Sequence, residues 1–323
     1  LFAYTSNSTI SNINTTDNWN GIYLKGSSNC QISENNAENN FDYGITLRLC
    51  RNCTINRNHI KNNNWSGISF GSSWNSVIAE NNVTNSYYGI HLVDSTNCLV
   101  ARNNVTEQNS GYSIVIYRAY DNTIYHNNFI NYFIYEYGKS NNTWDNGLEG
   151  NHWSGYGGLD VNQDGIGDTP YILDEHNEDN YPLMGAFCNF TISYEEKTYH
   201  VTIVSNSTIS NFSFEIADND GLEKMISFNV TGPDNTLGFC RIMIPHALMD
   251  GNYTVLIDGS EVSYTKLPCS NNTNSYLHFT YVHTQHEVMI VTEFPYPLIL
   301  PLTIMITSII IFLKKYRATP KGI

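Results

Sequence analysis

The chain has 323 residues, enough for two or three domains, with 30 acidic and 16 basic residues and a formal net charge of −14. Neutralising a phosphate backbone takes clustered Lys and Arg, so we expect no nucleic-acid partner. The sequence starts at Leu1 without an apolar export signal, and we expect the signal and further N-terminal coils to lie upstream.

A pattern that recurs every 22–24 residues dominates residues 1–143. Its anchor is a Gly-Ile pair, replaced once by Ser-Ile: Gly21-Ile22, Gly44-Ile45, Gly67-Ile68, Gly89-Ile90 and Ser113-Ile114. The period suits a leucine-rich repeat or a β-helix coil. Short alternating apolar runs between Asn and Gly favour strands and turns. The repeat therefore predicts a parallel β-helix.

Polar residues also recur at fixed offsets in these coils. Two Asn columns are expected to stack as hydrogen-bonded ladders and to tolerate left-handed corners. They are Asn29, Asn52, Asn75, Asn97 and Asp121, and Asn35, Asn58, Asn81, Asn103 and Asn127. A third column, Glu34, Arg57, Glu80 and Arg102, alternates in charge. It predicts an ion-pair ladder on an exposed face, with a lyase-like Arg/Glu site as the alternative.

Aromatic residues precede the Gly-Ile pairs, at Trp19, Tyr43, Trp65, Tyr87 and Tyr112. Flat rings at this spacing suit stacking on sugar faces, although corner aromatics also cover a core as plain packing. These residues are predicted to bind a glycan. A glycosidase needs two converging carboxylates. The coils lack dense acidic clusters, so no catalytic residue is predicted.

The coils and the segment that closes them resemble a known family. The closing residues are 142–145, 150–153 and 179–183. Over about residues 1–185 the chain resembles right-handed β-helix repeats of the NosD type, named for a periplasmic copper-binding protein. The resemblance implies a C-terminal cap at residues 144–185, an archaeal surface protein and a link to copper. Copper requires converging His, Met or Cys. The coil histidines stand at different offsets, so we do not expect copper there.

The segment 160–168 has the spacing of a calcium loop. Oxygen side chains stand at positions 1, 3, 5 and 9, and Gly165 at position 6, where such loops turn sharply. The predicted metal ligands are Asp160, Asn162, Asp164, Ile166, Asp168 and Asp174. Tyr171 stands where an EF-hand has its bidentate Glu, so the loop resembles those of extracellular calcium modules. The alternative is an Asp/Gly-rich turn that binds no ion.

Longer alternating strands follow the repeat. Seven to nine strands in residues 186–292 predict an immunoglobulin-like β-sandwich. Within it, Cys188, Cys240 and Cys269 allow one disulfide, and the His283-x-x-His286 spacing can chelate copper or zinc, although strand histidines without a ligand role are commoner.

The C-terminal end is predicted to be a membrane anchor. Residues 296–313 form an apolar span, and the basic tail 314–323 is expected in the cytoplasm, with everything earlier outside. Residues 292–295 resemble the sorting signal of archaeal surface proteins. Asn-x-Ser/Thr sequons before the span fit a glycoprotein.

The predicted fold is therefore all-β: a right-handed parallel β-helix, a β-sandwich and one transmembrane helix. We predict a single-pass cell-surface scaffold or adhesin that binds a polysaccharide or other glycan and is non-catalytic. The alternatives are a polysaccharide-active β-helix enzyme (lyase, hydrolase or epimerase) and a copper-binding NosD-like protein.

Overall fold

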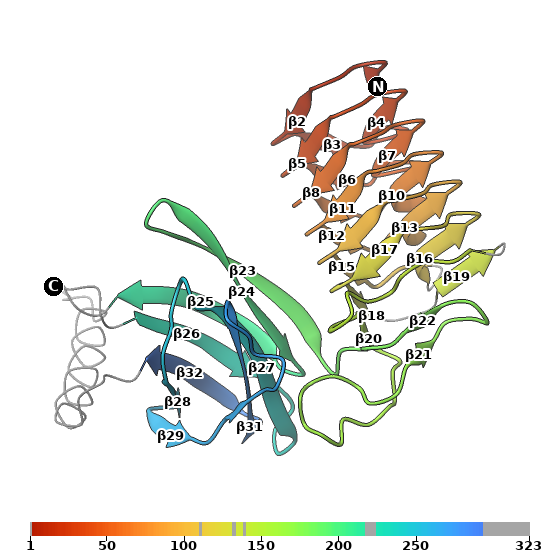
Figure 1. Ribbon diagram of the computed structural model, residues 1–323. Coiled ribbons are helices and arrows are strands. Elements are labelled where there is room, and N and C mark those ends of the chain that lie inside the picture. The colour runs from red at the N-terminus through yellow and green to blue at the C-terminus, as the bar shows by residue number, and fades with distance from the viewer. Residues whose placement is uncertain (1, 110–111, 131–133, 138–139, 217–223, 293–323) are drawn as a thin grey trace, which may run out of the picture.

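The computed structural model describes residues 2–109, 112–130, 134–137, 140–216 and 224–292. Every regular element within these ranges is a β-strand (Figure 1). A stack of coils at the N-terminal end is followed by two facing sheets (Figure 1). The predicted membrane span and basic tail, residues 296–323, lie outside the described residues. Within the described ranges no helix is long and apolar enough to cross a membrane.

Three parallel sheets form the walls of the coil stack. Sheet 1 contains β1 (Phe2–Ala3), β4 (Ile22–Lys25), β7 (Ile45–Arg48), β10 (Ser66–Gly71), β13 (Tyr88–Val93), β16 (Tyr112–Tyr117) and β19 (Ile134–Tyr137). Sheet 2 contains β2 (Thr9–Ser11), β5 (Gln31–Ser33), β8 (Thr54–Asn56), β11 (Val77–Ala79), β14 (Leu99–Ala101) and β17 (Thr123–Tyr125). Sheet 3 contains β3 (Asn14–Thr16), β6 (Asn36–Glu38), β9 (His59–Lys61), β12 (Asn82–Thr84), β15 (Asn104–Thr106), β18 (Asn128–Ile130) and β20 (His152–Trp153). The predicted parallel β-helix is confirmed.

The sequence repeat determines the register of these sheets. Ile68 of β10 pairs in parallel with Ile45 of β7 and with Ile90 of β13. Side chains alternate along a strand, so these Ile residues point inward and stack, and all are fully buried. The Gly before each Ile is required by a close approach, since a Cβ on Gly67 would collide with Val83.

A buried Asn ladder links the coils between sheets 2 and 3. The amide nitrogen of Asn81 donates to Oδ1 of Asn103 at 2.9 Å, and Asn103 donates in the same way to Asn127 at 2.9 Å. Each also donates to a backbone carbonyl of the preceding coil, as Asn103 does to Ile78. The left-handed backbone expected of Asn occurs in the other column, as at Asn52 with φ 51°. At the corner of the buried ladder the left-handed residue is instead the charged residue before the Asn, such as Arg102 at φ 58°. The Asn can therefore turn inward while its neighbour makes the bend.

The segment after the last coil covers the open end of the core. Trp144 is fully buried, and the Trp153 ring stacks on Phe129 with centroids 4.6 Å apart. Asp179 accepts hydrogen bonds from the backbone of Asn151 at 2.7 Å and from the Trp153 indole at 2.8 Å. Burial raises the pKa of Asp179 to about 6, against the opposing effect of these hydrogen bonds. A two-stranded sheet, β21 (Tyr171–Ile172) and β22 (Glu178–Asp179), lies in the same segment.

Two antiparallel five-stranded sheets make up the rest of the described chain. One contains β23 (Ala186–Tyr194), β24 (Lys197–Ser205), β27 (Leu237–Pro245), β31 (Asn274–Val282) and β30 (Thr265–Lys266). The other contains β25 (Thr208–Ile216), β26 (Lys224–Thr231), β32 (Gln285–Thr292), β28 (Tyr253–Ile257) and β29 (Ser260–Val262). Val201, Ile242 and Leu277 of the first sheet share one core with Phe228, Val255 and Ile290 of the second.

The disulfide expected in this sandwich is absent. All seven cysteines are free thiols. Cys240 is buried at hydrogen-bond distance from Ser205 and Tyr281, and Cys269 accepts from the Arg241 guanidinium at 3.5 Å. Cys240 and Cys269 thus have separate polar partners, and the disulfide that the three cysteines would allow is not formed.

Candidate functional site

The outer face of sheet 1 carries a groove across several coils. Ile45 and Leu47 of β7 point into the core, so Thr46 and Arg48 point outward. The outward positions of the next strand are Ser69 and Gly71, in register with Thr46 and Arg48. These small residues leave the floor of the groove low.

Aromatic and polar side chains border this floor and enclose a cavity of about 500 Å³. The aromatic members are Trp19, Tyr23 and Tyr43, and the charged members are Asp42, Arg48 and Asp94. His91 also lines the cavity, and burial lowers its pKa to about 4. The imidazole is therefore neutral near pH 7 and can offer both a donor and an acceptor.

The groove contains two carboxylates, those of Asp42 and Asp94. Asp42 precedes β7 and Asp94 follows β13, so they lie at opposite ends of the strands. Asp94 is also paired with Arg118 at 2.8 Å, while burial raises the pKa of Asp42. The groove therefore offers charged and polar groups beside its aromatic rings.

The predicted glycan residues fall into two groups. Trp19, which is 71% exposed, and Tyr43 line the groove. Trp65 instead stacks on Tyr87 at 5.3 Å, and Tyr112 contacts the same cluster through Tyr88 at 6.1 Å.

Sequence reasoning missed Tyr23, Asp42 and His91 as lining residues. Two of them could have been found, because Tyr23 and His91 occupy the outward position directly after an inward Ile of the repeat.

The charged column extends further than its four predicted members. Glu80 lies between Arg57, at 2.9 Å, and Arg102, at 3.1 Å. His126 occupies the next corner and contacts Glu149 at 2.8 Å, which in turn pairs with Arg241 of β27 at 2.8 Å. Glu34 has no ion pair within the described ranges.

Glu149 and Arg241, which continue the charged column beyond the coils, are buried between the β-helix and the sandwich. Side chains of Glu149 and Arg241 are 7% and 4% exposed. Burial raises the pKa of Glu149, but the His126 hydrogen bond and the Arg241 charge outweigh it and hold the pKa below its usual value. The pair therefore fixes the two domains to each other rather than forming a reactive site.

The loop 160–168 closes on its own backbone. Asp160 accepts from the amides of Asp164 at 3.0 Å and Gly165 at 2.8 Å, and Asp168 accepts from the amide of Val161. Burial, and the nearby charges of Asp160 and Asp168, raise the pKa of Asp164, although Ile166 and Arg241 oppose this. The loop thus holds its acidic groups near one another.

The other predicted ligands lie as follows. Asn162 accepts from the Asp164 amide at 3.0 Å, and Ile166 is buried against the sandwich. Asp174 accepts from Asn177 at 2.9 Å, so its carboxylate caps a separate turn. Nowhere in the described chain do three His, Cys, Asp or Glu side chains form a group that could hold a metal ion.

The histidines examined as copper ligands are occupied or apart. His283 is buried with Nε2 on Ser207 at 2.7 Å and Nδ1 on Thr236 at 2.6 Å, so neither ring nitrogen is free. His286 contacts Asp258 at 2.7 Å. In the coils, His126 contacts Glu149 and His59 lies beside Asn82. These histidines therefore do not fit copper, and no step through copper is derived.

Coils of three strands stacked in parallel sheets define the N-terminal domain as a parallel β-helix. Residues 1–158 match the model of the family described as periplasmic copper-binding protein (NosD). The NosD-type repeat family recognised in the sequence is confirmed over this part of the chain.

Among solved structures, the Dettilon tailspike protein is similar, with 12% identity, a TM-score of 0.36, and coverage of 88% of this chain and 63% of that chain. The phiAB6 tailspike, solved with oligosaccharides of an Acinetobacter baumannii surface polysaccharide, has 9% identity and a TM-score of 0.33, with coverage of 88% and 66%. This chain therefore spans less than two thirds of either tailspike. The search of curated proteins found no match.

Proposed function

We propose that this protein is a cell-surface β-helix that binds a glycan in the sheet 1 groove without cleaving it. The observation that carries the proposal is the cavity of about 500 Å³ in which Trp19 and Tyr43 border a floor of small residues. Aromatic faces bind the apolar faces of sugar rings, and the neighbouring carboxylates, guanidinium and imidazole suit sugar hydroxyls.

We propose that the remaining parts of the chain hold the β-helix at the cell surface. The sandwich is an immunoglobulin-like spacer, residues 296–313 cross the membrane, and everything before them lies outside the cell. This assignment rests on the apolar run and the basic residues after it.

The groove is tested by Trp19→Ala in the full chain against a panel of neutral and acidic polysaccharides. We expect roughly two- to tenfold weaker binding of the retained glycan, because a stacked aromatic contact is worth roughly 0.5–1.5 kcal/mol. Binding is measured by titration calorimetry. Trp74→Ala is the matched control, since Trp74 is also exposed but lies outside the groove lining. Equal loss in both variants would place the glycan elsewhere.

We further propose that loop 160–168 binds calcium, since a cation would relieve the repulsion among Asp160, Asp164 and Asp168. Calcium at a hundredfold excess over its Kd should raise Tm by about 5 to 10 °C, following the roughly 2.7 kcal/mol of linkage. Asp164→Asn keeps an acceptor for the Ile166 amide but lowers the charge, so its Tm should respond much less. Equal Tm of the wild type in calcium and in chelator would reject the site.

A further inference from the structure

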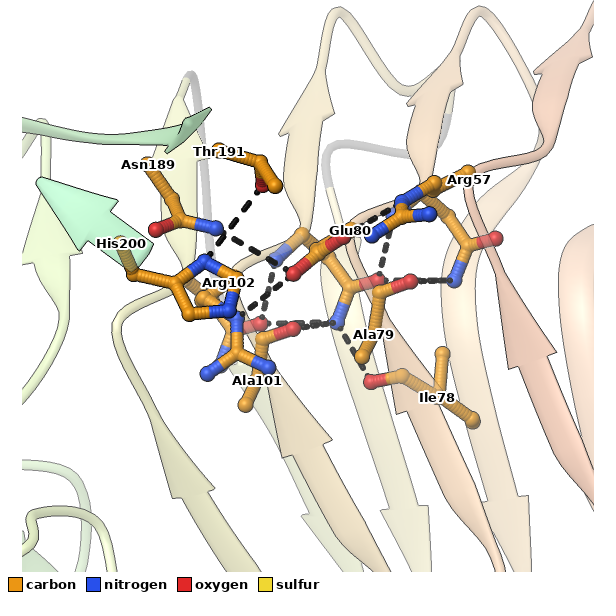
Figure 2. Close-up of polar contacts among 12 residues, drawn as sticks. Arg57, Ile78, Ala79, Glu80, Ala101, Arg102, Asn189, Thr191 and His200 are labelled. Carbon is orange, nitrogen blue, oxygen red and sulfur yellow. Dashed lines mark hydrogen bonds and ion pairs between the residues drawn. The ribbon is translucent and has the colours of Figure 1, made fainter. Parts of the chain in front are cut away.

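A second cavity lies between the β-helix and the sandwich, at the corner between sheets 2 and 3, whereas the groove lies on sheet 1. It has a volume of about 300 Å³ and is lined by the charged column and by the first sandwich strand, β23. Figure 2 shows Glu80 between Arg57 and Arg102, with Asn189 and Thr191 of β23 beside them. The cavity is therefore built by both domains.

The two arginines have unused hydrogen-bonding capacity. Arg57 and Arg102 each donate to Glu80 through Nε, at 2.9 and 3.1 Å. Within the described residues, neither guanidinium makes a hydrogen bond through its two terminal nitrogens. Their side chains are 50% and 33% exposed, so these donors are accessible to a ligand. Paired guanidinium N–H groups match the geometry of a carboxylate.

The charge of the cavity is positive in a strongly acidic protein. Glu80 is the one acidic residue in its lining, against two arginines. Burial raises the pKa of Glu80, but the Arg57 hydrogen bond and the charges of both arginines outweigh it and keep the pKa low. Glu80 thus stays ionised and holds the guanidinium groups in place, and one positive charge remains.

Uncharged hydrogen-bond acceptors also line the cavity. Asn189 donates to Glu80 at 3.3 Å through its amide nitrogen, and Asn104 donates to Asn82 at 3.2 Å. The amide oxygens of Asn189 and Asn104 accept no hydrogen bond from the described residues. They are placed to accept from sugar hydroxyls beside the arginines.

We infer that this interdomain cavity binds a carboxylate-bearing sugar, with Arg57 and Arg102 holding the carboxylate and the Asn amides contacting the ring hydroxyls. The site is separate from the sheet 1 groove and does not depend on glycan binding there. Asn82, Asn104 and Asn189 are sequon asparagines, so the test protein is produced in a host without N-glycosylation.

The test is calorimetric titration of the full chain with a galacturonate trisaccharide and with the neutral galactose trisaccharide. The acidic sugar should bind and the neutral one should bind at least tenfold more weakly. Arg57→Gln and Arg102→Gln should each weaken the acidic sugar at least tenfold. Arg51→Gln, which removes the same charge from an exposed residue outside the cavity, should leave the affinity within twofold.

Two further variants keep the outcome decisive. Arg57→Lys retains the charge beside Glu80 but lacks the paired donors, so it should fold normally and still bind several-fold more weakly. Trp19→Ala should leave galacturonate affinity unchanged. Galacturonate binding that is lost in Trp19→Ala and kept in both Arg→Gln variants would overturn this site and leave the groove proposal standing. If Arg51→Gln weakened galacturonate binding as much as Arg57→Gln and Arg102→Gln, the effect would come from the overall charge of the protein, and the proposed site would be wrong.

Discussion

Asn103→Ala should lower the free energy of unfolding of the β-helix by about 3 kcal/mol, whereas Asn104→Ala should lower it by less than about 1 kcal/mol. Asn103 is fully buried, and its Oδ1 accepts from both the backbone and the side chain of Asn81. Its truncation orphans these donors and the Ile78 carbonyl, and each unsatisfied buried group costs about 1–3 kcal/mol.

The neighbouring residue makes a matched control. Asn104 belongs to the solvent-side ladder, where its amide donates to Asn82 at 3.2 Å and water can replace the bond. Urea unfolding followed by tryptophan fluorescence reports on the correct domain, because all five tryptophans lie at or before residue 153. Similar destabilisation by both substitutions would mean that the buried ladder is not what holds the coils together.

Arg241→Met should destabilise the protein by about 3–5 kcal/mol, because it leaves the buried Glu149 without its cation. It also removes the donor to the Asp164 carbonyl at 2.8 Å, through which the sandwich holds loop 160–168. The double variant Glu149→Gln/Arg241→Met removes the uncompensated charge and should recover part of the loss. Thermal unfolding of the three proteins measures this, and a double variant no more stable than Arg241→Met would contradict it.

The same pair gives this interface a defined pH response. The folded pKa of Glu149 is held below its ordinary 4.5. A depressed carboxyl pKa contributes stability above the unfolded value, and that contribution is lost as the pH falls through the folded value. The acid sensitivity below about pH 4.5 should therefore be smaller in Glu149→Gln/Arg241→Met than in the wild type.

The β-helix could be predicted because the same stabilising interactions recur in every coil. One Gly-Ile pair and one Asn per coil occupy equivalent positions in every turn, so periodicity alone locates inward residues such as Ile68 and ladder residues such as Asn81. The charged column was traced through Arg102 for the same reason. Its buried end was missed, because Glu149 comes from the cap and Arg241 from a strand 92 residues later.

The groove was only partly visible in the sequence. Trp19 and Trp65 occupy similar places in their coils, yet the Tyr87-Tyr88 pair gives Trp65 two ring contacts within its own cluster. Such ring contacts depend on the conformation of the turn before each Gly-Ile pair, whose length varies between coils. In loop 160–168 the spacing of the acidic residues could be seen in the sequence. The hydrogen bonds that Asp160 accepts from backbone amides could not, because they depend on the conformation of the loop.

The central claim, binding without cleavage, is tested most directly by incubating the full chain with the polysaccharide it retains and assaying for new reducing ends and unsaturated products. We expect neither product to accumulate while the polysaccharide stays bound, and we expect Trp19→Ala to weaken that binding. Product formation that is abolished by Asp42→Asn or Asp94→Asn would contradict the account and identify the groove as an active site.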